Sequence, residues 1–205
     1  MDQSAYDLDW MRRHLYVAVV ADVLDALSAR HQVASLELRR VSGESPLVGR
    51  AKTTQWEDLD DVDSRPYELE LVAVDTCQPG DVLVAAAGGS LRSGIWGELL
   101  STAARNRGCV GAIVDGAVRD VAKMNEIGFS VFSRGTSPRD SLHRQRVTAV
   151  DVAVTLGGVR VEPGELILAD DDGLVVVPAA LETRAWRPPC RAAPGCRPRC
   201  AATGT

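Results

Sequence analysis

Several features that would place a protein in a functional class are missing from this chain of 205 residues. No hydrophobic run approaches the length of a membrane-spanning helix, and residues 1–10 lack the basic-then-apolar order of a signal peptide, so we expect a cytoplasmic protein with no membrane partner. The formal net charge of -5 lacks the basic excess that phosphate binding favours, which argues against a nucleic-acid partner. The five cysteines do not form the pattern of a secreted disulfide framework, so reduced thiols are expected.

The composition that is present favours one compact domain with an unusual tail. A hydrophobic content of 45% over this length can bury a substantial core, and we assign residues 1–182 to a single domain. Residues 183–205 contain five arginines, four prolines, three cysteines and no acidic residue, a composition that predicts disorder. The abrupt change suggests the hypothesis that this tail is translated from a shifted reading frame, which resequencing of the gene would test.

The first third of the domain is predicted to be a packing helix followed by short strands. Apolar residues at helical spacing predict one helix over residues 5–30. Strand-like segments follow at 36–41 and 48–55. The acidic run at 57–63 lacks the glycine and spacing of a calcium loop, so we interpret it as a solvated loop before a helix with Ser64 as its N-cap.

The middle of the chain alternates apolar strands with helices. This alternation with short connections predicts parallel strands joined by right-handed crossovers, and ligands collect at the carboxyl ends of such strands. The expected elements are a strand at 82–87 that ends in Gly88 and Gly89, a helix at 97–106, a strand at 109–115, a short helix at 120–127 and a strand at 130–133.

The chain after Pro138 has a different pattern. Strand-like segments at 148–156, 159–161, 165–169 and 174–177 are separated by turn residues. We expect a mostly β region that folds back on the sheet. The three consecutive aspartates at 170–172 are interpreted as part of a turn rather than as a metal site.

The start of the predicted helix at 97–106 is a candidate anion site. Its first turn, which consists of Gly97, Glu98, Leu99 and Leu100, exposes backbone N–H groups, and glycines before it let a carboxylate or phosphate approach closely. Alternatively, the glycines only permit a tight turn and Glu98 complements the helix dipole. The glycines alone favour that alternative, because the G-x-G-x-x-G fingerprint and the P-loop are both absent.

Arg119 and Asp120, which follow the next strand, change that weighing. The guanidinium of Arg119 can bind a carboxylate or an oxo group, and Asp120 can hold a divalent cation through oxygen, so together they could stabilise a developing enolate. The alternatives are a structural ion pair between the two residues, or Asp120 as the N-cap of the following helix. The residues by themselves favour neither interpretation.

Five short motifs occur in a fixed order along the chain. They are WGELL at 96–100, DG-x-x-RD at 115–120, FSVFSRG at 129–135, V-x-PGE at 161–165 and ADDDGLVVVP at 169–178. From about residue 15 to residue 182, the chain therefore resembles the family of RraA-like proteins and class II 4-hydroxy-4-methyl-2-oxoglutarate / 4-carboxy-4-hydroxy-2-oxoadipate (HMG/CHA) aldolases.

The resemblance implies an α/β fold and a metal-dependent site. The fold is a swivelling β/β/α domain with a parallel-strand core and a mostly β C-terminal half, assembled as a homotrimer or a dimer of trimers with active sites between subunits. In the aldolases, the amides that correspond to residues 97–100 bind the carboxylate of pyruvate. Arg119 would contact the 2-oxo oxygen, Glu98 would order metal-bound water, and Asp120 would ligate Mg²⁺ or Mn²⁺.

The chemistry that the resemblance implies is cleavage of a carbon–carbon bond in a small 2-oxo acid. Cleavage leaves a pyruvate enolate, which Arg119 and the cation stabilise before it is protonated, and loss of carbon dioxide from oxaloacetate gives the same enolate. Two features depart from the aldolase pattern. Glu98 stands where the aldolases have aspartate, and the tail at 183–205 occupies the region from which they draw an acidic residue of a neighbouring subunit.

Two other functions remain open from the sequence. One is a non-catalytic RraA-like regulator that inhibits an RNA-degrading endonuclease by protein contact, a role that an acidic body suits. The other is an inert trimer in which the tail prevents completion of the site. An assay for pyruvate with and without magnesium separates the enzyme from both.

Overall fold

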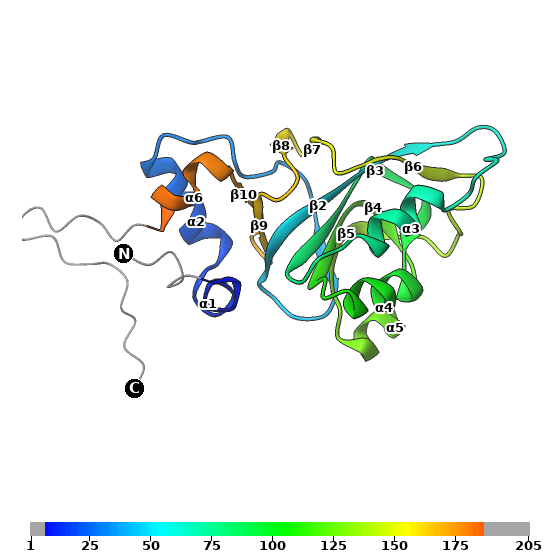
Figure 1. The fold of residues 1–205 in the computed structure, drawn as a ribbon, viewed down its shortest axis with the longest axis horizontal. Helices are drawn as coiled ribbons and strands as arrows, with labels where there is room; N and C mark the ends of the chain where they lie inside the picture. The colour runs from blue at the N-terminus through cyan, green and yellow to red at the C-terminus, as the bar shows by residue number, and fades with distance from the viewer. Residues whose placement is uncertain (1–6, 187–205) are drawn as a thin grey trace, which may run out of the picture.

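A mixed β-sheet forms the centre of the structure (Figure 1). The computed structural model describes residues 7–186. Its large sheet has 8 strands in the order β1-β5-β4-β3-β2-β9-β10, with β6 paired to β2 beside this path. Strands β2–β3, β3–β4 and β4–β5 are parallel neighbours, which confirms the predicted parallel core. The bounds are β1 (Arg39–Ser42), β2 (Leu47–Asp58), β3 (Asp81–Trp96), β4 (Gly111–Val118) and β5 (Ser130–Thr136).

The C-terminal half returns to this sheet as antiparallel strands. β6 and β9 both pair with β2, and β10 pairs with β9. A separate two-stranded sheet is formed by β7 and β8. The bounds are β6 (Gln145–Val150), β7 (Val154–Leu156), β8 (Val159–Val161), β9 (Leu166–Asp170) and β10 (Gly173–Val177). The predicted mostly β C-terminal half and the α/β fold class are therefore confirmed.

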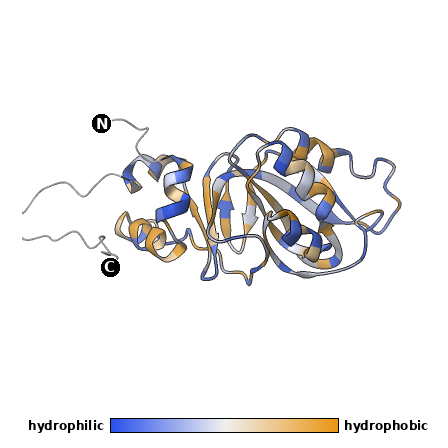
Figure 2. Cartoon of the chain, turned by 90° about the horizontal axis from the view of Figure 1, so that it is seen from below, coloured by the Kyte–Doolittle hydropathy of each residue, from blue (hydrophilic) through white to orange (hydrophobic). Residues whose placement is uncertain are grey.

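Three helices cover one face of the parallel core, next to one another in Figure 1. They are α3 (Glu68–Asp75), α4 (Glu98–Asn106) and α5 (Val121–Ile127). Their buried residues, such as Val74, Ala104 and Met124, form one apolar cluster with Leu83 and Val114 of the strands. The helices carry both hydrophilic and hydrophobic colour in Figure 2, as expected when one side of a helix packs on a sheet. This packing fixes where α4 and α5 begin relative to the strand ends.

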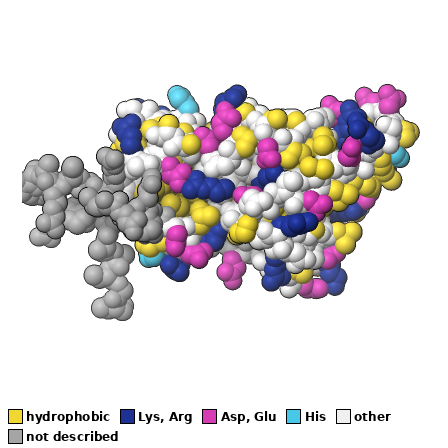
Figure 3. Space-filling view, viewed as in Figure 1, with side chains coloured by type: hydrophobic (Ala, Val, Ile, Leu, Met, Phe, Trp, Pro, Cys, Tyr) yellow, Lys and Arg dark blue, Asp and Glu magenta, His cyan; other side chains and the backbone are white. Residues whose placement is uncertain are grey.

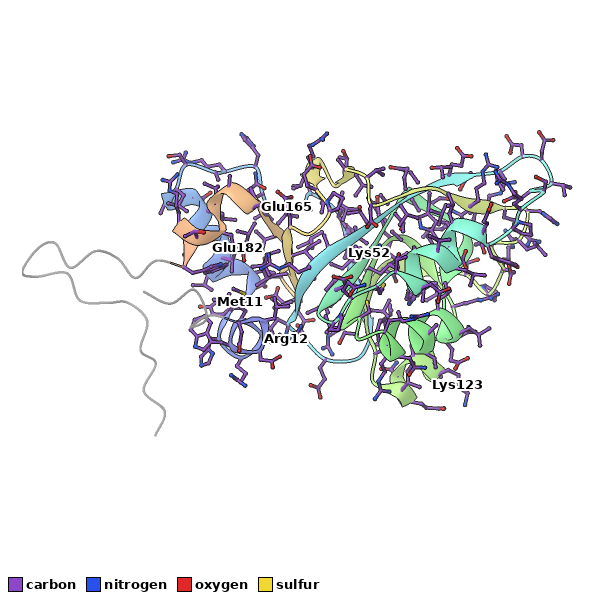
Figure 4. All side chains as sticks on the ribbon, viewed as in Figure 1. Met11, Arg12, Lys52, Lys123, Glu165 and Glu182 are labelled. Atoms are coloured by element: carbon purple, nitrogen blue, oxygen red, sulfur yellow. The ribbon has the colours of Figure 1, made fainter. Side chains whose placement is uncertain are left out.

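The remaining three helices lie together at the other end of the molecule (Figure 1). They are α1 (Leu8–His14), α2 (Val17–Ala26) and α6 (Ala179–Ala185), and they pack against β9 and β10. Arg50 of β2 joins this group to the sheet, because its guanidinium donates to both carboxylate oxygens of Glu182 over 2.7 and 2.6 Å. Figure 4 labels Glu182 on α6 and Lys123 on α5, far apart in the view.

The prediction of one helix over residues 5–30 is wrong, because two helices form. The backbone is extended at Leu15 and Tyr16, between α1 and α2. The N–H of Val17, at the start of α2, donates to Oδ2 of Asp170 over 2.7 Å. A carboxylate from 153 positions away thus stabilises the start of the second helix, and local periodicity carries no signal for such a contact.

Two smaller predictions are also wrong. The N-cap of α3 is Tyr67 rather than Ser64, and Tyr67 has a left-handed backbone (φ 65°). The strand expected to end at Gly88 and Gly89 continues to Trp96 as β3. The pairing of β3 with β4 continues through three shifts of register, the first of them between Ala85 and Ser90. The two glycines therefore lie at an irregularity within the strand and do not end it.

The predicted boundary at residue 182 falls inside α6, which ends at Ala185. From residue 187 onward, the predicted disordered tail lies outside the described residues.

No helix within residues 7–186 is long and apolar enough to cross a membrane. Acidic and basic side chains are interspersed on the face drawn in Figure 3.

Candidate functional site

The ends of β3 and β4 bring the predicted site residues together. In the parallel register Trp96 of β3 pairs with Val118 of β4, and the N–H of Arg119 donates to the carbonyl of Trp96 over 2.8 Å. Helix α4 follows β3 and helix α5 follows β4. Residues 97–100, Arg119 and Asp120 are therefore neighbours, and we call this set the strand-end site.

Gly97 allows the two strand ends to pack closely. A Cβ at this position would lie 2.5 Å from Oδ2 of Asp120 and 3.0 Å from Cγ of Arg119. The backbone of Gly97 is extended (φ -159°), so glycine is needed here for space and not for a left-handed conformation. The Asp120 carboxylate occupies the space where any other residue would place its side chain.

The first turn of α4 presents backbone N–H groups beside this carboxylate. The first hydrogen bond within the helix runs from the N–H of Ser101 to the carbonyl of Gly97 over 3.0 Å, so Leu99 and Leu100 have no helical acceptor for their N–H groups. The N–H of Glu98 donates to Oδ2 of Asp120 over 3.3 Å, a long hydrogen bond. The helix start therefore has two N–H groups without a helical acceptor and a third, that of Glu98, with a long hydrogen bond.

Asp120 occupies the N-cap position of α5 but does not cap that helix. Its backbone is left-handed (φ 56°) and its side chain makes no capping hydrogen bond. The carboxylate contacts the N–H of Glu98 instead and lies 3.7 Å from Nε of Arg119. The expected side-chain N-cap of α5 is therefore not formed, and the ion pair with Arg119 is present only as a contact too long for a hydrogen bond.

A divalent cation at this site would have few protein ligands. Within residues 7–186, no group of three or more His, Cys, Asp or Glu side chains is arranged to hold a metal ion. The Asp120 side chain is 42% exposed, and Oε1 of nearby Glu98 accepts a hydrogen bond from Oγ1 of Thr102 over 3.2 Å. Mg²⁺ commonly keeps several waters and binds through one or two carboxylates plus substrate oxygens. Asp120 fits the part of a single carboxylate ligand in such a site.

Arg119 makes its shortest ion pair with a residue that the sequence did not indicate. Nη1 of Arg119 lies 2.8 Å from Oδ2 of Asp140, in the segment between β5 and β6. Oδ1 of the same carboxylate accepts from the hydroxyl of Tyr67 and from the N–H of Leu142, both over 2.7 Å. Tyr67 and Asp140 are 73 positions apart, and no motif links them, so the sequence carried no signal for this contact.

Glu70, one turn along α3 from Tyr67, is a buried acid near this carboxylate. Its exposed fraction is 9%, and burial, with the negative charge of Asp140 as a smaller cause, raises its pKa to about 8. Burial and the hydrogen bond to Asp140 raise the pKa of Tyr67 to about 12. Burial would also raise the pKa of Asp140, but hydrogen bonds from Leu142, Tyr67 and Arg119 outweigh it, and this pKa is lowered. At neutral pH, Asp140 is therefore ionised and Glu70 is protonated.

A cavity of about 200 Å³ opens elsewhere, beside the start of α3. We call it the α3 cavity, and it does not include any residue of the strand-end site. Both arginines of its lining have a carboxylate partner: Arg146 lies 2.8 Å from Glu57, which is outside the lining, and Arg65 lies 3.2 Å from Glu68. It is lined by Asp63, Arg65, Tyr67, Glu68, Leu69, Glu70, Arg146, Val147 and Thr148.

Comparison with known proteins gives a family for this fold and site. The family model described as RraA-like, Aldolase/RraA, matches residues 17–176. The chain belongs to the RraA-like family. The resemblance inferred from the five motifs is thereby confirmed.

Relatives within the RraA-like family have names from two functional classes. A protein of Halalkalibacterium halodurans named "Putative 4-hydroxy-4-methyl-2-oxoglutarate aldolase" is 30% identical over 182 residues, which covers 89% of this chain and 81% of that protein. Streptomyces coelicolor RraAS2, described as an unusual member of the RNase ES inhibitor RraA family, is 31% identical with a TM-score of 0.75 and covers 87% of each chain. The RNA-processing inhibitor RraA of Thermus thermophilis is 29% identical with a TM-score of 0.65, covering 78% of this chain and 92% of its own.

At the level of the family, the first of these names supports a lyase of the aldolase type. The other two names describe inhibitors. Because both classes share the fold, the choice between them depends on the residues at the strand ends.

Proposed function

We propose that this protein is a divalent-metal-dependent aldolase that cleaves 2-oxo acids of the 4-hydroxy-4-methyl-2-oxoglutarate type to pyruvate, with oxaloacetate decarboxylation as a side activity. The observation that carries the proposal is the contact of Asp120 with the start of α4, where Oδ2 lies 3.3 Å from the Glu98 N–H. Nε of Arg119 lies 3.7 Å from the same oxygen, so a carboxylate, a guanidinium and backbone donors are close enough to act on one small ligand, which supports the proposal. A regulator that acts only through its surface has no need for this arrangement.

Each residue of the strand-end site has a role in the proposal. The N–H groups of residues 97–100 bind the carboxylate of the pyruvyl group. The guanidinium of Arg119 faces the 2-oxo oxygen, where its positive charge stabilises the enolate that forms as the carbon–carbon bond breaks. The electron pair of that bond stays on the pyruvyl fragment as an enolate, which takes up a proton to give pyruvate. The other fragment gives its hydroxyl proton to solvent and leaves as a carbonyl compound or, from oxaloacetate, leaves as carbon dioxide.

Asp120 is the residue that would hold Mg²⁺ or Mn²⁺. When bound, such a cation supplies Lewis-acid polarisation of the oxo group. Glu98 lies next to Asp120 and would order water near it. The hydrogen bond from Thr102 to Oε1 of Glu98 leaves the second oxygen of that carboxylate for this purpose.

The proposal includes assembly as a homotrimer or a dimer of trimers, with sites between subunits. Two features support it: the Leu99 side chain, in the first turn of α4, is 74% exposed, and the Asp120 carboxylate is also accessible. An apolar side chain at the mouth of a polar site is a surface that a neighbouring subunit would cover.

The proposed location is the cytoplasm. Cys77 and Cys109 are free and buried, which fits its reducing environment.

The test is pyruvate formation from oxaloacetate, measured with a coupled dehydrogenase with and without Mg²⁺. A protein-free reaction with Mg²⁺ measures the spontaneous decarboxylation that the cation itself promotes. We expect metal-dependent turnover above this background, with Arg119→Ala and Asp120→Ala each lowering it about 100- to 1,000-fold. A parent protein no faster than the background contradicts the proposal, and full activity in both variants moves the site elsewhere.

The second candidate is a non-catalytic regulator of an RNA-degrading endonuclease. The structural similarity to two proteins described as RNA-processing or RNase inhibitors favours it. The discriminating measurement is the rate at which the endonuclease of the source organism cleaves RNA in the presence of increasing amounts of this protein. Inhibition together with background-level turnover supports the regulator, whereas turnover without inhibition supports the aldolase.

A further inference from the structure

The guanidinium of Arg119 is held by contacts outside the strand-end site. Its Nη1 lies 2.8 Å from Oδ2 of Asp140, while its Nε is 3.7 Å from Oδ2 of Asp120. The ion pair with Asp140 is therefore the close one. Because the side chain of Arg119 is 31% exposed, it would have several accessible conformations without that partner.

Asp140 is itself fixed by three donors. Oδ1 accepts from the Tyr67 hydroxyl and the Leu142 N–H over 2.7 Å each, and Oδ2 faces Arg119. The donors come from the start of α3, from the end of β4 and from the segment between β5 and β6. A carboxylate with hydrogen bonds from three separate parts of the chain has little freedom to rotate. Its ion pair with Arg119 therefore restricts the conformations of the guanidinium as well.

The charges around this carboxylate favour a single arrangement. At neutral pH, Asp140 is ionised and the nearby Glu70 is protonated, because burial raises the pKa of Glu70 to about 8. Only one of these two acids then carries a negative charge that attracts Arg119. Tyr67, with a pKa raised to about 12, remains a donor over the same pH range.

We propose that Asp140 and Tyr67 are positioning residues for Arg119, and that they hold its guanidinium where it meets the 2-oxo oxygen of the substrate. The proposal rests on the proposed function of the strand-end site. Asp140 orients the guanidinium through Nη1, and Tyr67 orients Asp140. The side chain of Arg119 is 31% exposed, so the guanidinium held by Asp140 remains accessible to a ligand.

The kinetic test compares Asp140→Asn and Tyr67→Phe with a matched control, Asp151→Asn. The asparagine keeps the shape of the carboxylate and can still accept from Leu142 and Tyr67, so the fold is retained. Asp151 pairs with Lys52 over 2.6 Å, and Lys52 lies on β2, away from α5 in Figure 4. We expect kcat to fall about 10- to 100-fold in Asp140→Asn and about 3- to 10-fold in Tyr67→Phe, with a smaller change in KM, because a displaced electrophile lowers stabilisation of the transition state. Because Lys52 is 7% exposed and loses its ion pair in this variant, turnover is compared per folded molecule, and on that basis the control should remain within about twofold of the parent.

A double-mutant cycle separates action through Arg119 from a direct or structural effect. In an Arg119→Ala background, Asp140→Asn should change turnover less than about twofold, because the group that it positions is gone. Equal losses in both backgrounds would overturn the proposal. So would an Asp140→Asn variant that behaves like Asp151→Asn.

A spectroscopic measurement tests the same inference without turnover. The Nε–Hε resonance of Arg119 in the ¹⁵N-labelled protein is assigned by its loss in Arg119→Lys. We expect this resonance to shift or broaden in Asp140→Asn and to a smaller extent in Tyr67→Phe, while Asp151→Asn leaves it in place. An unchanged resonance in Asp140→Asn overturns the positioning role. If the parent lacks turnover but the resonance responds, the proposed function fails and the positioning of Arg119 stands.

Discussion

The strand-end site and the α3 cavity differ in what their polar groups already contact. In the α3 cavity, the arginines have carboxylate partners nearby, as in the pair of Arg146 with Glu57 at 2.8 Å. In the strand-end site, Arg119 pairs with Asp140 at 2.8 Å, but the polar contacts of Asp120 within residues 7–186 are long, at 3.3 and 3.7 Å, and the N–H groups of Leu99 and Leu100 have no helical acceptor. This contrast supports the proposal that the ligand binds at the strand-end site and not in the α3 cavity.

Tyr67 and Glu70 connect the two regions. Both line the α3 cavity, and both interact with Asp140, the partner of Arg119. Substitutions on the strand-end side should change catalysis, whereas substitutions confined to the cavity should not. Tyr67 and Glu70 are exceptions, because Tyr67 also holds Asp140 and because burial of Glu70 affects the stability of the domain.

The largest effect is expected for Glu70→Gln, in the pH dependence of stability. The native pKa of Glu70 is about 8 against an ordinary 4.5, so between these values the native state holds a proton that the unfolded state has lost. The free energy of unfolding therefore falls as pH rises from about 5 to about 8 and is level above that, with a total loss of about 2 to 5 kcal/mol.

Glu70→Gln should lack this loss and should be more stable than the parent at pH 9. Urea unfolding followed by circular dichroism at several pH values measures the difference. Glu68→Gln, which removes an exposed carboxylate on the same helix, is the matched control and should follow the parent curve. Parallel curves for the parent and Glu70→Gln would show that Glu70 is ionised in the native state.

Gly97→Ala should give the next largest effect, on turnover. The new Cβ would meet Oδ2 of Asp120 at 2.5 Å and Cγ of Arg119 at 3.0 Å, so both side chains must move. We expect turnover to fall about 100-fold, because displacements of about 1 Å at reacting groups have effects of this size. Gly135→Ala is the control, since its Cβ would meet only methyl groups of Leu91 at 3.4 and 3.7 Å. Equal turnover in the two variants would mean that the packing at Gly97 does not define the site.

Glu98→Gln should have a moderate effect. If this carboxylate orders water beside Asp120, its neutral isostere should lower turnover about 10-fold. Glu98→Asp keeps the charge in a shorter side chain and should stay within about threefold of the parent. Steady-state kinetics with oxaloacetate distinguish the two, and similar losses in both would indicate that the length of the side chain matters more than its charge.

Arg146→Ala should have the smallest effect and tests the cavity. Arg146 lines the α3 cavity, and its ion pairs within residues 7–186 are with Glu57 and Asp63, which lie outside the strand-end site. Turnover and KM should remain within about twofold of the parent. A loss comparable to that of Arg119→Ala would reverse the assignment of the two regions.

The parallel core could be predicted from the sequence because its signals are local. Apolar strands alternate with helices that are followed by Gly108 and Gly128, both with left-handed backbones. From this alternation, the rule that ligands bind at the carboxyl ends of parallel strands places residues 97–100 near Arg119 and Asp120. The division of the N-terminal helix could not be predicted, because it depends on the contact of Val17 with Asp170.

The environment of Arg119 could not be predicted either. Asp140 lies in an irregular segment after β5, and Tyr67 lies at a helix start 73 positions earlier. Only the folded sheet brings them together. The continuation of β3 past Gly88 and Gly89 has the same origin, since pairing with β4 across register shifts overrides two residues that favour a turn.

The most direct test of the strand-end site is a crystal structure of the full chain grown with pyruvate and Mg²⁺. We predict density for pyruvate with its carboxylate at the N–H groups of residues 97–100, its oxo group facing Arg119, and a cation at Asp120. Pyruvate bound in the α3 cavity, with the strand-end site holding only solvent, would contradict this account.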